Sequence, residues 1–174
     1  MIKRALLLLA VLGTTVLAGC GSDDGSTASA SASASASGST ASGECEVVDG
    51  TDAERDAEVH VTLDEWAIDA DTDSVEAGNI EFDAKNIGED DHELVIVKGA
   101  LPKDLTITDD GLDEDALPEG AEVLGEIEGF PGGDSCHGTF ELAAGDYTLL
   151  CNIVEASEHE AHAHEGMVTA FRVS

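Results

Sequence analysis

Apolar residues recur at every second position in several short segments, and this pattern restricts the fold more than any other feature. Val59, Val61 and Leu63 share one face of the segment 57–63, and the segment 167–173 has the same period. A period of two is typical of half-buried β-strands and does not match the 3.6-residue period of a helix. Further short strands are predicted over 80–83, 94–97, 140–142 and 147–151. The pattern indicates an all-β sandwich.

Turn residues separate these predicted strands. Glycine-containing turns are expected at 76–79, 131–133 and 144–146. The acidic stretch 102–120 contains two prolines, which predicts a long loop with one helical turn at 114–117. A long connection in a small sandwich fits a Greek-key crossover. The expected fold class is therefore a Greek-key β-sandwich.

The N-terminal residues have the layout of a secretory signal. Two basic residues precede an apolar run that continues to Ala18. The run is short for a bilayer-spanning helix, which needs about 20 apolar residues. It ends in Leu17-Ala18-Gly19-Cys20, which resembles the lipobox of bacterial lipoproteins. The resemblance implies a signal peptide over 1–19 and a lipid on Cys20. An uncleaved anchor, or an ordinary signal followed by a chance cysteine, is the alternative.

Low-complexity sequence follows Cys20. Ser and Ala alternate strictly from Ala28 to Ser37, and nothing between 20 and 44 can bury a core. We interpret 20–44 as a disordered tether and 45–174 as one folded domain. The predicted location is the extracytoplasmic face of the cell membrane.

The charge of the chain excludes one class of partner. It has 38 acidic and 7 basic residues, giving a net charge of −31. A positive nucleic-acid-binding surface is incompatible with this balance. Anionic lipid would also repel the domain, so the lipid on Cys20 is the expected link to the membrane. A saline habitat and a basic redox partner both fit the acid excess.

Two segments carry residues with metal chemistry. His92 follows Asn86-Ile87-Gly88 and leads into a predicted strand. Cys151 ends another predicted strand, and His162 and Met167 precede the last one. A thiolate suits Cu(I), an imidazole suits Cu(II), and two imidazoles with one thiolate and a weak thioether serve both states. No catalytic triad, paired-carboxylate site or phosphate loop is apparent, so catalysis is not expected.

Together these segments resemble the cupredoxins, the type 1 copper proteins that include plastocyanin. The resemblance covers roughly residues 60–174 and implies one bound copper ion. It implies four ligands, with two alternates for the second imidazole: His92, Cys151, His162 and Met167, with His164 and His159 as the alternates. The implied function is a monomeric one-electron carrier with a redox protein partner. Copper capture and delivery, or a metal-free binding domain, are the alternatives.

One feature departs from the family pattern. Ten residues lie between Cys151 and His162, where cupredoxins usually have only a few. Extra loop length costs little entropy, so such a loop can still close over a metal. It also brings carboxylates that can compete for the ion, namely Glu155, Glu158 and Glu160.

The four cysteines are consistent with this resemblance. If Cys20 carries a lipid and Cys151 binds copper, Cys45 and Cys136 remain as a pair. An exported protein lies in an oxidising compartment, where that pair is expected to form a disulfide. A Cys45–Cys151 disulfide is the alternative, and it would abolish the copper site. His60 and His137 are expected to be surface or edge residues.

Overall fold

The structure is a computed structural model that describes residues 45–155 and 160–174. The predicted signal peptide, the lipidation site Cys20, the tether and the alternate ligand His159 lie outside the described residues. Within the described part, no helix has the length and apolar character needed to cross a bilayer.

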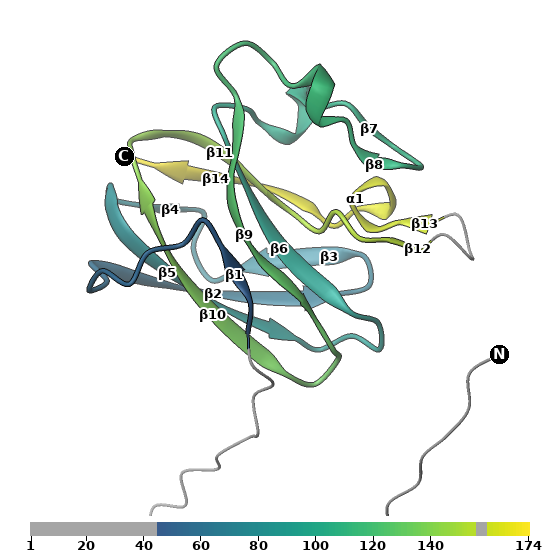
Figure 1. Cartoon of the computed structure of the whole chain (residues 1–174), viewed down its shortest axis with the longest axis horizontal. Helices are drawn as coiled ribbons and strands as arrows, with labels where there is room; N and C mark the ends of the chain where they lie inside the picture. Colours follow the sequence, from purple (N-terminus) through teal and green to yellow (C-terminus); the bar gives the residue numbers. More distant parts are fainter. Residues whose placement is uncertain (1–44, 156–159) are drawn as a thin grey trace, which may run out of the picture. The chain divides into compact units, whose positions relative to one another are not determined.

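Two sheets form the body of the domain (Figure 1). One has the strand order β1-β9-β6-β11-β14-β4, and the other has the order β10-β5-β2-β3. The strands of the first sheet are β1 (Val47–Val48), β4 (Ser74–Val75), β6 (His92–Lys98), β9 (Glu122–Phe130), β11 (Gly145–Leu150) and β14 (Val168–Val173). The strands of the second sheet are β2 (Ala57–Asp64), β3 (Ala67–Ala70), β5 (Gly78–Asn86) and β10 (Ser135–Leu142). The predicted β-sandwich is confirmed.

The core lies between the two sheets and follows the alternating pattern. Val59, Val61 and Leu63 of β2 are buried, whereas the residues between them are exposed or half-buried. Phe82 contacts two other phenylalanines, with its ring centroid 5.6 Å from that of Phe171. Full burial of one such side chain contributes about 1.5–3 kcal/mol, so the phenylalanines and aliphatic residues together make a large stabilising contribution.

The predicted strands are all present, but other strands were not predicted, and β9 is the longest of these. Its sequence contains two glycines and three glutamates, which weaken the β signal. A side chain at Gly125 would place its Cβ 2.7 Å from the carbonyl oxygen of Val48 and 2.8 Å from the ring of Phe140. Close packing of β1 and a core phenylalanine therefore requires glycine here, and the sequence pattern cannot reveal that requirement.

The segment between β6 and β9 is more structured than a loop. It contains two short 3₁₀ helices, η1 (Pro102–Asp104) and η2 (Glu114–Ala116), so the helical turn predicted near 114–117 is present. Between them lies a small ladder of β7 (Ile107–Thr108) and β8 (Gly111–Leu112). The segment joins two neighbouring strands of the same sheet, and the chain passes between the sheets elsewhere, for example from β5 to β6.

The segment between β6 and β9 contacts the short helix α1 (His162–Glu165), which lies beside β7 and β8 (Figure 1). Leu112 and Ala163 are buried in one cluster with Val95, Val97 and Leu150. The helix α1 is therefore packed between the β6–β9 segment and the first sheet.

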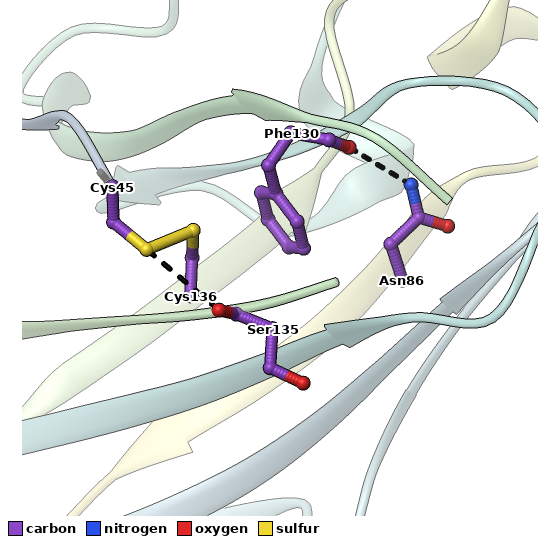
Figure 2. The surroundings of a disulfide bond; sticks show 5 residues. All are labelled: Cys45, Asn86, Phe130, Ser135 and Cys136. Atoms are coloured by element: carbon purple, nitrogen blue, oxygen red, sulfur yellow. Dashed lines mark hydrogen bonds between the residues drawn. A yellow bond between two sulfur atoms is a disulfide. The ribbon is translucent and has the colours of Figure 1, made fainter. Parts of the chain in front are cut away.

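A disulfide joins the two sheets. Cys45 precedes β1 and is bonded to Cys136 of β10, with 5.5 Å between their Cα atoms. Figure 2 shows this bond with Phe130 and Asn86 nearby. Cys151 is a buried free thiol, so the alternative Cys45–Cys151 pairing does not occur.

Candidate metal centre

The turn before His92 is built around Asn86, whose side chain is fully buried. Its Nδ2 donates to the carbonyl oxygens of Asp90 (2.8 Å) and Phe130 (3.0 Å). Its Oδ1 accepts the N–H of Gly88 at 2.9 Å. One amide therefore satisfies three backbone groups and fixes the path from β5 to His92, the first residue of β6.

Cys151 follows β11 and is linked by backbone bonds to the segment that carries the second histidine. Its N–H donates to the carbonyl oxygen of Met167 at 3.0 Å, and the N–H of Met167 donates to that of His162 at 3.0 Å. The N–H of His162 in turn donates to the carbonyl oxygen of Ile153 at 3.0 Å. These bonds position the thiol and the second imidazole relative to each other.

The ten-residue insertion after Cys151 forms a hairpin of β12 (Val154–Glu155) and β13 (Glu160–Ala161). Val154 pairs with Ala161, which returns the chain to the site directly before His162. Three carboxylates of this segment were named as groups that can compete for the ion. Glu155 and Glu160 lie outside the group of converging donors, and Glu158 lies outside the described residues.

Three potential ligand atoms converge at this end of the sandwich. The Nδ1 atoms of His92 and His162 are 3.2 Å apart, and the Sγ of Cys151 is 3.4 Å from Nδ1 of His162. All three side chains are buried, and their ligand atoms lie within 4.8 Å of one another. A metal about 2.0–2.3 Å from each of three donors in a plane requires donors about 3.5–4 Å apart. The observed spacing fits a single ion after small shifts.

Burial shifts the pKa values of two of the three donors. Burial raises the pKa of the Cys151 thiol to about 12. Burial, and then the neighbouring His92, lower the pKa of His162. Both shifts favour the uncharged forms of Cys151 and His162. A bound metal ion would take the place of the thiol proton.

The ring of His162 packs against Trp66. The two rings meet edge to face, with centroids 5.1 Å apart. Nε2 of His162 is buried and has no hydrogen-bond partner among the described residues. Gly166 ends α1 with φ at 135°, and a Cβ there would lie 2.9 Å from the carbonyl oxygen of Trp66. The glycine therefore lets the helix end lie close to the Trp66 backbone.

The other predicted histidines and Met167 lie as follows. Met167 is fully buried in the same core cluster as Cys151. His164 is exposed on α1, with Nδ1 at 3.1 Å from a carboxylate oxygen of Asp109, and lies outside the donor group. His60 and His137 are exposed, as expected. His60 lies near Asp83 and Glu58 on the outer face of the second sheet, where Arg55 already pairs with Glu58.

Comparison with known proteins supports the fold assignment. No family model matches the chain, and no curated protein matches it. Auracyanin B matches in structure with a TM-score of 0.50 at 20% sequence identity, over 72% of this chain and 94% of that one. The chain has the cupredoxin fold. A reduced auracyanin from Roseiflexus castenholzii matches with a TM-score of 0.47 at 23% identity, over 68% of this chain and 96% of that one.

Two carboxylates at this end of the cupredoxin fold were not predicted from the sequence. Oε1 of Glu65 lies 3.2 Å from Nε2 of His92. Oε1 of Glu93 accepts the N–H of Asn152 at 2.8 Å, and burial raises the pKa of Glu93 to about 7. Both belong to a set of 38 acidic residues, and Glu65 precedes His92 by 27 positions. Only the folded arrangement distinguishes them from the others.

Proposed function

We propose that this chain binds one copper ion between His92, Cys151 and His162 and carries single electrons. The observation that carries the proposal is the convergence of two imidazole nitrogens and one thiol sulfur in a buried site. A trigonal set of two histidines and one cysteine is typical of electron-transfer copper sites, and copper supplies the one-electron couple. Met167 directly precedes β14 and is buried in one cluster with Cys151, and it is the proposed weak axial ligand.

The surroundings of the three donors favour electron transfer over other uses of copper. Each donor segment is held by backbone hydrogen bonds, so a change of oxidation state would require little rearrangement. The N–H of Glu93 points at Sγ of Cys151 over 3.5 Å, which stabilises negative charge on the sulfur. The donor side chains are fully buried, which leaves no open position for a substrate. We therefore propose a carrier and not an enzyme.

The cellular setting belongs to the same proposal. Cys20 would hold the protein at the outer face of the membrane by a lipid, with 20–44 as the tether. The Cys45–Cys136 disulfide is consistent with an oxidising compartment. A net charge of −31 favours a basic redox partner and a monomer, because copies of the chain repel one another.

The test is optical. The purified full chain, titrated with Cu(II), is expected to develop an intense visible band from the bond between sulfur and copper at one equivalent. Cys151→Ser and His162→Gln should abolish the band. His164→Gln is the matched control and should retain it, because His164 lies outside the donor group.

The three candidate functions give different results. A band with a reversible midpoint potential supports a carrier. Copper uptake without the band would favour capture or delivery of the ion. A chain that takes up no copper would leave a cupredoxin-like binding domain.

A further inference from the structure

Glu65 lies in the turn between β2 and β3, and its carboxylate faces the loop that leads to His92. A single oxygen, Oε1, accepts the N–H groups of Glu89 (2.8 Å) and Asp90 (3.0 Å). The same oxygen lies 3.2 Å from Nε2 of His92. Two backbone N–H donors on one oxygen stabilise the ionised form of the carboxylate.

This contact determines which nitrogen of His92 carries the proton. An ionised carboxylate only accepts hydrogen bonds, so Nε2 of His92 must be the donor. A neutral imidazole has one N–H, so Nδ1 keeps its lone pair. Nδ1 is the atom that faces the second imidazole at 3.2 Å. Glu65 thus selects the tautomer in which His92 presents a lone pair to the proposed copper position.

The loop before His92 is shaped to receive this carboxylate. A Cβ at Gly88 would overlap the carboxylate of Glu65, so a larger residue there would displace the end of the Glu65 side chain. Asn86 bonds the same loop through the N–H of Gly88 and the carbonyl oxygen of Asp90. The loop therefore has two polar side chains bound to its backbone, and Glu65 is the one that also reaches His92.

We propose that Glu65 is a positioning residue that holds Nδ1 of His92 toward the metal and whose charge makes the imidazole a stronger ligand for Cu(II). This inference rests on the proposed copper function. A carboxylate bonded to the outer nitrogen of a ligating histidine orients the ring and raises its basicity. Cu(II) carries one more positive charge than Cu(I), so the negative charge favours the oxidised state. Glu65 therefore lowers the midpoint potential.

Two variants of the full chain separate the charge from the hydrogen bonds. In Glu65→Gln an amide oxygen can accept the same three hydrogen bonds, but the charge is lost. In Glu65→Ala the hydrogen bonds are lost as well. Glu89→Gln is the matched control, because it removes one charge from an exposed residue of the same loop.

Three readouts apply: the affinities for Cu(II) and Cu(I), the midpoint potential, and the ¹⁵N NMR shifts of His92 in the metal-free protein. For Glu65→Gln we expect about tenfold weaker Cu(II) binding, a smaller change for Cu(I) and a raised potential. For Glu65→Ala we expect a loss of about 10–100-fold in Cu(II) affinity. The metal-free wild type should carry its His92 proton on Nε2, and Glu65→Ala should lose that preference.

Two results would overturn the inference. One is an unchanged potential in Glu65→Gln, or an equal shift in Glu89→Gln, which would make the effect one of general charge. The other is a metal-free wild type with the His92 proton on Nδ1. If the wild type takes up no copper, the proposed function fails, but the NMR readout still decides whether Glu65 selects the tautomer. A purely structural role would lower the melting temperature without changing the tautomer or the ratio of the two affinities.

Discussion

The Cys45–Cys136 disulfide closes a loop that spans most of the folded domain, so its removal should have a large effect on stability. The two cysteines are 91 positions apart. In the chain-entropy account, a cross-link over about 90 residues stabilises the fold by about 4–5 kcal/mol. Domains of this size have free energies of unfolding of about 5–15 kcal/mol, so the domain is expected to stay folded with a much smaller margin.

The double variant Cys45→Ala/Cys136→Ala is the appropriate perturbation. A single variant would leave a free thiol that can pair with Cys151, which is itself a free cysteine. Reduction of the wild type is the matched control, because it removes the cross-link but keeps both side chains. Cys136 is 2% exposed, so a larger loss in the double variant than in the reduced wild type would measure its packing.

Guanidinium unfolding followed by circular dichroism is the assay. Guanidinium is also a salt, so it screens the repulsion within a chain of net charge −31 in every sample. With a slope of about 4 kcal/mol per molar, a loss of 4–5 kcal/mol lowers the midpoint by about 1 M. The copper band of the double variant should match that of the oxidised wild type, because neither cysteine belongs to the donor group. Equal midpoints for oxidised and reduced protein would refute the loop-closure reasoning.

Two further predictions concern Asn86, in the turn before His92, and Glu126 of β9. Asn86→Ala removes the partner of three backbone groups and should lower the free energy of unfolding by about 2–4 kcal/mol, which chemical unfolding measures. The variant should also bind copper more weakly, which a copper titration measures. Burial, and then Glu128, raise the pKa of Glu126, so the fold favours its protonated form. That contribution is present below the usual carboxyl pKa and is lost as pH rises through the raised value. Glu126→Gln should therefore raise the guanidinium unfolding midpoint near pH 7 and leave it unchanged at pH 4. An equal rise of the midpoint at both pH values would contradict this reasoning.

The sequence predicted those strands that bury one face and expose the other. Val59, Val61 and Leu63 alternate with polar residues, and these positions form β2 with the three apolar side chains buried. In β9 the pattern is broken by Gly125, whose identity is dictated by Val48 on the neighbouring strand and by Phe140 on the facing sheet. Such a requirement exists only after the sheets have packed, and for that reason it cannot be read from the local pattern.

The same distinction applies to the metal centre. His92, Cys151 and His162 were predicted because their order along the chain, and their places relative to the predicted strands, resemble the cupredoxin pattern. Glu65 has the same residue type as many solvated carboxylates, and its contact with His92 depends on the turn between β2 and β3. Trp66 was not predicted to lie near the site, and its ring contact with His162 also depends on that turn.

The insertion after Cys151 tests whether loop length or backbone bonding determines the position of the second imidazole. The N–H of His162 is bonded to Ile153, and Val154 pairs with Ala161, so we expect these backbone bonds to determine the place of His162. Replacing 156–159 with Asn-Gly, a two-residue hairpin turn, should therefore leave the energy of the copper band unchanged. This variant also removes the alternate ligand His159. A shifted or absent band, in a variant with the wild-type circular dichroism spectrum, would show that the insertion itself shapes the site.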